Sequence, residues 1–207
     1  MKFNCDCDYC NYNGYLWLLK NNIVWVEIPK NASYNLKSNR FNFKGDYTIE
    51  QTPNAHLMKI SNIDLNIHKR GFVILRNPIE RFKSMISHFF IQGDRAQIGK
   101  HWLDKLGFNY YNNNNIVDIV FNVWDKIKSI YESHHFNSQS SFIPNEFFEI
   151  KNHMVYNTNE VSFMFGLPKG INSSNSSNIF ISDKNLKNIL DIYKDDVDLY
   201  RKYFSKI

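Results

Sequence analysis

Two short stretches of the chain place basic and small polar residues directly after an apolar run. In the first, the mostly apolar residues 22–28 lead into Pro29, Lys30, Asn31, Ala32 and Ser33. Backbone amides at such a turn, with a lysine and a hydroxyl group, can bind a phosphate-type anion. The triphosphate loop G-x-x-x-x-G-K-[ST] is absent, because no glycine occurs between Gly14 and Gly45. The turn therefore predicts an anion site that does not cradle a triphosphate, and an ordinary loop with an exposed lysine is the alternative.

The second stretch is "VILRNPIERFKSMIS", residues 73–87. Arg76 follows an apolar run that is typical of a strand, while Arg81 and Ser84 fall on the helix predicted to begin at Pro78, with Asn77 as its N-cap. Arginine suits bidentate contact with phosphate, and open α/β sheets bind ligands at the carboxyl ends of strands. The alternative is a surface ion pair of Glu80 with a neighbouring basic side chain.

Together the two stretches resemble the cofactor-binding segments of the PAPS-dependent sulfotransferases, where PAPS is 3′-phosphoadenosine-5′-phosphosulfate. "IPKNAS" is similar to the 5′-phosphosulfate loop, P-K-x-[GA]-[ST]-[ST], although Tyr34 stands where the family has Ser or Thr. "LRNPIERFKSMIS" matches the 3′-phosphate segment, R-x-P-x-x-R-x-x-S. The nearest branch is the uronyl 2-O-type carbohydrate sulfotransferases. The resemblance implies a P-loop-NTPase-like sulfotransferase fold, PAPS as sulfate donor and no required metal.

Three further segments are similar to that branch. "HHFNSQSSFI" resembles the acceptor loop, and "FMFGLPKGINSSNSS" resembles a loop near the nucleotide. "DIYKDDVDLYRKY" resembles the terminal Y-x-x-D helix. The resemblance implies that acceptor contacts come from His134, His135 and Gln139. It also implies that the cofactor is contacted by residues from Pro29 to Ser33, by Arg76, Arg81 and Ser84, and by Asn172 and Ser173.

Sulfuryl transfer requires positioning, neutralisation of charge on the leaving phosphate, and a base for the acceptor hydroxyl. Lys30 is the predicted charge-neutralising group. Histidine titrates close to neutral pH, and the resemblance places His56 at the position of the base. His134, His135 and Glu27 remain alternatives.

These residues must be held by a scaffold, and the chain predicts an α/β fold. Apolar runs indicate strands, and helical spacing indicates helices that flank a central, mostly parallel sheet. The predicted strands are 22–28, 72–75, 146–150 and 153–157, and the predicted helices are 78–90, 115–131 and 183–204. The last helix forms one or two pieces, with Asp183 as its candidate N-cap. We expect a single domain over residues 1–207, with an N-terminal arm at 1–20 and an insert at 91–115.

Composition narrows the class of partner. The formal net charge of +5 suits an anionic ligand, and no basic run is dense enough to indicate a nucleic-acid tail. Apolar stretches are strand-sized and no signal pattern is visible, so we expect no membrane span and a cytoplasmic protein. Cys5, Cys7 and Cys10 are the only cysteines, which fits either a metal or redox clip or an arm with reduced thiols.

The sequence thus predicts a sulfotransferase that moves the sulfuryl group of PAPS to a hydroxyl of a carbohydrate or other small acceptor. The alternative is a non-catalytic nucleotide- or glycan-binding module of the same fold. A kinase using ATP is disfavoured because the glycines of the triphosphate loop are missing.

Overall fold

A computed structural model describes residues 16–19, 22–32, 64–92, 95–109, 111–161 and 178–205. The predictions made for the cysteine arm, Ser33, Tyr34, His56, Asn172 and Ser173 lie outside these residues.

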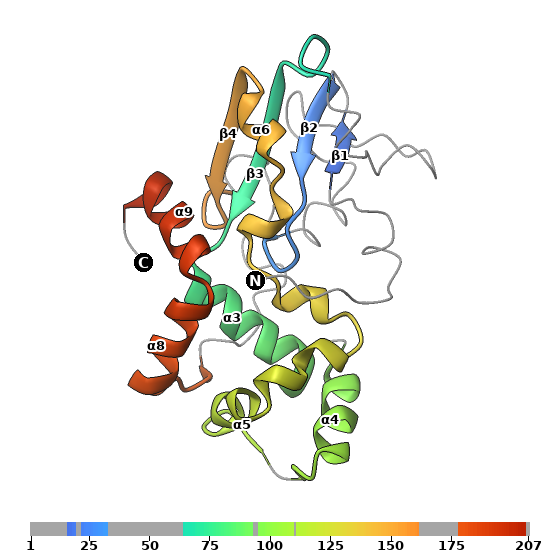
Figure 1. Cartoon of the computed structure of the whole chain (residues 1–207), viewed down its shortest axis with the longest axis vertical. Helices are drawn as coiled ribbons and strands as arrows, with labels where there is room; N and C mark the ends of the chain where they lie inside the picture. Colours follow the sequence, from blue (N-terminus) through green and yellow to red (C-terminus); the bar gives the residue numbers. More distant parts are fainter. Residues whose placement is uncertain are drawn as a thin grey trace.

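The described residues form an α/β structure around a mixed, four-stranded sheet (Figure 1). Its strands, in spatial order, are β1 Leu16–Leu19, β2 Ile23–Val26, β3 Arg70–Leu75 and β4 Asn152–Asn157. β1 pairs with β2 in antiparallel fashion, whereas β2, β3 and β4 are parallel. The prediction of a mostly parallel sheet is confirmed, and the carboxyl ends of the three parallel strands meet at one edge.

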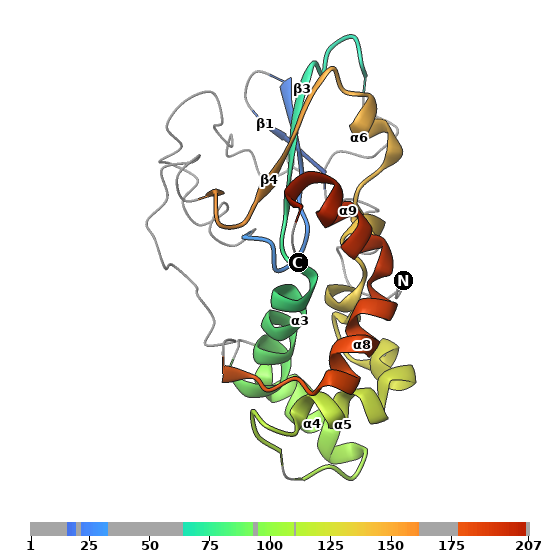
Figure 2. The ribbon, with the colours of Figure 1, turned by 90° about the vertical axis from the view of Figure 1, so that its left-hand side faces the viewer.

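Helices cover one face of the sheet and the region beyond its carboxyl edge. Figure 2 shows α6 (Asn145–Glu149) and α9 (Lys194–Phe204) on the same side of the strands. Beyond the carboxyl edge lie α3 Pro78–Ile86, α4 Ala96–Lys105, α5 Ile116–Asn122 and α8 Asp183–Ile192 (Figures 1 and 2). A π-helical turn, Ser87–Ile91, extends α3, and short 3₁₀ turns occupy Trp124–Ser129, Ser133–Phe136 and Ser140–Phe142.

Strands β2 and β3 are buried on both faces, whereas most residues of β4 are exposed or half-buried. Burial on both faces is why β2 is a continuous apolar run. Val24 and Val26 face the core shared with α6 and α9. Ile23 and Trp25 face the opposite core, where Trp25 stacks on Phe72 with ring centroids 6.1 Å apart. The sheet is thus anchored from both sides, and the ends of its strands are held in fixed positions.

A third core lies among the helices and is centred on aromatic rings. Phe82 of α3 is fully buried and stacks on Phe121, with centroids 5.6 Å apart. It also contacts Trp124 and Tyr193, at 6.2 and 6.3 Å between centroids. This core fixes the direction in which α3 leaves strand β3.

Helix α3 begins where the sequence predicts. The Asn77 side chain accepts hydrogen bonds from the backbone N–H groups of Ile79 (3.0 Å) and Glu80 (3.3 Å). Pro78 occupies the first turn, where its missing N–H is not needed. The prediction of this cap and of the proline start is confirmed.

Three predicted elements differ from the structure. Residues 146–149, predicted as part of a strand at 146–150, belong to helix α6, which buries Phe147 in the core shared with β2 and α9. The predicted helix 115–131 breaks at Val123 into α5 and a 3₁₀ turn. The N-cap of α8 is Ser182, whose hydroxyl accepts from Asn185, and not Asp183.

The predicted insert contains helix α4, which packs against the π-helical turn. Leu103 is fully buried in the helical core. A Cβ atom on Gly99 would come within 1.9 Å of the Phe89 carbonyl oxygen, so glycine is required for this close approach. In the part of the chain that the structure describes, we find no helix long and apolar enough to cross a membrane.

The Asn77 cap gives a test of the local structure below the site. Replacing Asn77→Ala removes the acceptor for two N–H groups and should lower the free energy of unfolding by about 1 kcal/mol. Urea denaturation followed by circular dichroism measures the change. Asn77→Asp retains the acceptor and should cost little, and the exposed Asn122→Ala at the end of α5 is the matched control. A loss for Asn77→Ala no larger than that for Asn122→Ala would contradict the cap.

Candidate functional site

The two predicted anion-binding stretches meet at the carboxyl edge of the sheet. Lys30 follows β2 and Arg76 follows β3, and these strands are parallel neighbours. The Arg76 Nη1 group donates to the Lys30 carbonyl oxygen over 3.3 Å. The Arg76 side chain is therefore brought against the backbone of Lys30, 46 residues earlier in the sequence.

The turn after β2 has an unusual backbone. Lys30 and Ala32 both adopt the left-handed conformation, with φ of 69° and 64°. Residues other than glycine occupy this region at a cost and only where the surroundings hold them there. The holding contact is Asn31, which is 2% exposed and donates its Nδ2 group to the Ile74 carbonyl oxygen over 2.8 Å. The turn without glycine is thus pinned to the neighbouring strand.

Gln139 clamps this turn to the start of the second stretch. Its Oε1 atom accepts from the Arg76 backbone N–H (2.9 Å) and from Asn31 Nδ2 (2.5 Å). Its Nε2 group donates to the Arg76 carbonyl oxygen over 2.8 Å. The side chain is 1% exposed, so the residue predicted to contact the acceptor is engaged with the protein's own backbone.

Arg81 is buried and holds two loops together. Its Nε group donates to the Pro29 carbonyl oxygen (3.1 Å). Its Nη1 and Nη2 groups donate to the backbone carbonyl oxygens of Asn137 (2.8 Å) and His135 (3.0 Å). The side chain is 1% exposed. The predicted surface pair forms between Lys83 and Glu80 at 3.2 Å, and it does not involve Arg81. Arg81 thus joins the turn after β2 to the histidine loop, residues 133–140.

Two side chains near the start of α9 hold the histidine loop from the other side. The Tyr193 hydroxyl donates to the Phe136 carbonyl oxygen over 2.8 Å. The Asp196 carboxylate accepts from the backbone N–H groups of Gln139 (2.7 Å) and Ser140 (2.9 Å). Burial raises the pKa of Asp196, while Arg81 and the two N–H groups act to lower it. The loop backbone is therefore satisfied by side chains, as buried backbone groups require.

Histidine side chains gather beside Lys30. The rings of His88 and His135 stack with centroids 5.8 Å apart, and His134 lies 4.5 Å from His135 by the same measure. Burial lowers the pKa of His135 well below 6.5, and the nearby His134, Lys30, His88 and Arg81 lower it further. Burial also lowers the pKa of His134 to about 4, with Glu132 opposing and Arg81 reinforcing the shift. Both imidazoles are neutral at pH 7.

Both basic and acidic groups lie around His135. Besides burial, Lys30 and Arg81 help to lower its pKa, and the Glu132 carboxylate lies 4.0 Å from its Nε2 atom. The nearby carboxylate, Glu132, is bound by Arg95 through two contacts of 2.7 and 2.9 Å. Burial lowers the pKa of Arg76, but a guanidinium keeps its charge at any physiological pH. The arrangement fits an anionic ligand.

The remaining predicted residues lie as follows. Ser84 is 3% exposed on α3, Pro29 is buried, and Ala32 is half-buried. Glu27, the alternative base, is 4% exposed and accepts from the Trp17 indole N–H over 2.6 Å. Within the described ranges, no three His, Cys, Asp or Glu side chains gather as a metal ion would require.

Two buried polar atoms at the site have no hydrogen-bond partner, Asn31 Oδ1 and His135 Nδ1. Such atoms are rare in folded proteins and occur where function or a bound ligand accounts for them.

Sequence reasoning missed the roles of Asp196 and Tyr193. The Y-x-x-D spacing was the available signal, because residues three apart face the same side of a helix.

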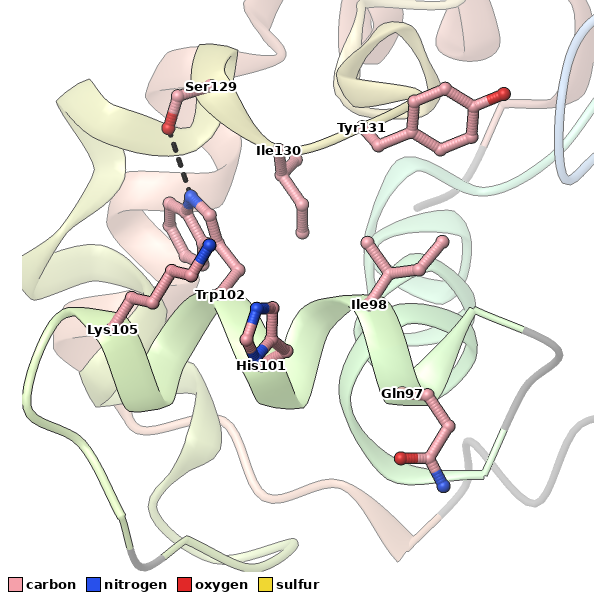
Figure 3. Close-up of a pocket in the computed structure, with 8 residues that line it drawn as sticks. All are labelled: Gln97, Ile98, His101, Trp102, Lys105, Ser129, Ile130 and Tyr131. Atoms are coloured by element: carbon pink, nitrogen blue, oxygen red, sulfur yellow. Dashed lines mark hydrogen bonds between the residues drawn. The ribbon is translucent and has the colours of Figure 1, made fainter.

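A groove of about 400 Å³ lies beside the histidine loop, between α4 and residues 129–131 (Figure 3). Ile98 and Ile130 line it, together with Trp102, whose indole N–H donates to the Ser129 hydroxyl over 2.9 Å. His101 and Lys105 add basic groups along α4. Tyr131, at the end of the groove, is 56% exposed and directly precedes Glu132 of the site.

Comparisons of the chain with protein families, with curated proteins and with solved structures give no match.

The contacts of Arg81 predict a large effect on stability. Arg81→Leu leaves three buried carbonyl groups without their donor and removes the cation near Asp196, so we expect a loss of about 3–5 kcal/mol in the free energy of unfolding. Arg81→Lys should restore only part of it, because one ammonium group cannot reproduce the forked geometry. Denaturant titration measures both, with the exposed Arg201→Leu on α9 as control. Equal losses for Arg81→Leu and Arg201→Leu would show that Arg81 does not hold the loops.

The neutral histidines predict a pH dependence of stability. Because the pKa of His134 is about 4 in the folded protein and about 6.5 in the unfolded chain, the unfolded state binds the extra proton between these values. Stability is therefore full above pH 6.5 and falls as the pH drops towards 4, by about 2 kcal/mol from pH 7 to pH 5 for this residue. Denaturant titrations at pH 7 and pH 5 measure this change in the free energy of unfolding. The decrease between the two pH values should be larger in wild type than in His134→Gln by that amount. His153→Gln is the control, and an unchanged pH dependence in His134→Gln would refute the assignment.

Proposed function

We propose that the protein is a sulfotransferase that moves the sulfuryl group of PAPS to a hydroxyl group of a carbohydrate or similar acceptor. The observation that carries the proposal is the meeting of Lys30 and Arg76 at the carboxyl ends of two adjacent parallel strands. Ligands of α/β sheets bind at such edges, and the two cations belong to the two segments that resemble the family's phosphate-binding motifs.

The charged groups at the site match those of PAPS. PAPS carries anionic groups at the 3′ and 5′ positions of its ribose, and the site offers the ammonium group of Lys30 and the guanidinium group of Arg76. In the proposal Arg76 binds the 3′-phosphate, and Lys30 with the amides of its turn binds the 5′-phosphosulfate. The 3′-phosphate contact is what would distinguish PAPS from ATP. Ser84, Asn172 and Ser173 remain predicted cofactor contacts.

Arg81 takes a different place in this proposal from the one its motif implies. All three of its observed hydrogen bonds go to backbone carbonyl oxygens, and its side chain is buried. We assign it the role of holding the turn after β2 against the histidine loop, so that Arg76 remains the arginine that faces the ligand.

In the reaction, PAPS supplies the sulfuryl group, whose bond to the 5′-phosphate oxygen breaks as its bond to the acceptor oxygen forms. Lys30 stabilises the charge that grows on the leaving phosphate. The acceptor's proton passes to a base. The low pKa values of His134 and His135 make them weak bases, which favours the predicted His56 for this step and leaves the other two to contact the acceptor.

The groove beside the histidine loop supports an acceptor that contains a ring. Trp102 and Tyr131 offer aromatic surface, and His101 and Lys105 offer polar contacts at the side (Figure 3). Ligand sites commonly combine apolar walls with a few polar groups. We place the part of the acceptor remote from the reacting hydroxyl in this groove.

Calorimetry with the desulfated product, 3′-phosphoadenosine 5′-phosphate (PAP), tests the function. PAP should bind wild type at least about tenfold more tightly than AMP, because a charge-assisted pair of the 3′-phosphate contributes 1.4 kcal/mol or more. Arg76→Ala should abolish this preference, whereas the exposed Arg201→Ala should retain it. Equal binding of PAP and AMP by wild type would overturn the proposal.

Transfer is then followed with radiolabelled PAPS and a panel of carbohydrate acceptors. Wild type should label an acceptor, and Lys30→Ala should retain PAP binding better than it retains transfer. Tight binding of PAP without transfer to any acceptor would favour the non-catalytic binding module.

A further inference from the structure

The position of Arg76 is set by a side chain that does not face the ligand. Gln139 bonds to both backbone groups of Arg76, accepting from its N–H over 2.9 Å and donating to its carbonyl oxygen over 2.8 Å. This double contact imitates a strand partner just past the point where β3 ends at Leu75. It fixes the backbone from which the Arg76 side chain projects, and Asn31 binds the same Gln139 oxygen.

Gln139 is itself positioned by helix α9. Asp196 is 1% exposed, and its carboxylate accepts hydrogen bonds from the backbone N–H groups of Gln139 (2.7 Å) and Ser140 (2.9 Å). Charge-assisted bonds of this kind are stronger than neutral ones, and here they are shielded from water. A chain of contacts therefore leads from Asp196 through Gln139 to Arg76.

We propose that Gln139 and Asp196 are positioning residues that set the preference of the site for a 3′-phosphorylated nucleotide. The inference rests on the proposed function, because it concerns the anion that Arg76 binds. Neither residue touches the ligand. Both act by holding the Arg76 backbone in the place from which its guanidinium reaches the 3′-phosphate.

The test measures the ratio of PAP to AMP affinity by calorimetry in Gln139→Leu and Asp196→Asn. Leucine keeps the approximate bulk but none of the three hydrogen bonds. Asparagine presents a donor to one of the two N–H groups that Asp196 accepts. In each variant the ratio should fall about tenfold, which corresponds to 1.4 kcal/mol.

The ratio separates positioning from general destabilisation. Partial unfolding lowers the apparent affinity for PAP and AMP by the same factor, so it leaves their ratio unchanged. Asp195→Asn and Asp198→Asn, which lie exposed on the same helix, are matched controls and should keep the wild-type ratio. If Asp196→Asn does not fold, Gln139→Leu carries the same test.

A double-mutant cycle shows whether Gln139 acts through Arg76. Adding Gln139→Leu to Arg76→Ala should not change the ratio further, because the side chain being positioned is gone. A wild-type ratio in folded Gln139→Leu, or equal effects of Gln139→Leu with and without Arg76, would overturn the inference while leaving the proposed function intact. Wild type that binds PAP no better than AMP would overturn both.

Discussion

The buried guanidinium of Arg81 is the contact on which the rest of the site depends. The turn after β2 and the histidine loop lie beyond the sheet, so hydrogen bonds between strands cannot satisfy their buried carbonyl groups. Arg81 provides three of these bonds, to Pro29, His135 and Asn137. A buried cation is stable only with such partners, and the neighbouring Asp196 adds the opposing charge.

This arrangement divides the arginines of one motif between two tasks. Arg81 is directed inwards by the helical core around Phe82, whereas Arg76 lies half-buried at the strand end beside Lys30. Asp196 on α9 holds the backbone of Gln139, and the Gln139 side chain in turn bonds to the backbone of Arg76. In our proposal these contacts hold Arg76 and the turn of Lys30 in place before an anionic nucleotide binds, as electrostatic preorganisation requires.

Local rules predicted some parts of this structure and long-range packing decided others. The cap at Asn77 and the start at Pro78 follow from the chemistry of those residues, and the meeting of Lys30 with Arg76 follows from parallel strands. The stretch 146–150 has the aromatic composition of a strand, yet most of it lies in helix α6, where Phe147 is fully buried. The inward direction of Arg81 depends on loops 54 and 56 residues away along the chain, which spacing within its own motif cannot reveal.

A crystal structure with PAP bound tests the central claim most directly. The account predicts the 3′-phosphate within hydrogen-bonding distance of the Arg76 guanidinium and the 5′-phosphate beside Lys30. Arg81 should keep its contacts with Pro29, His135 and Asn137. A nucleotide bound away from the carboxyl edge of the sheet, or an Arg81 turned out to hold a phosphate itself, would contradict it.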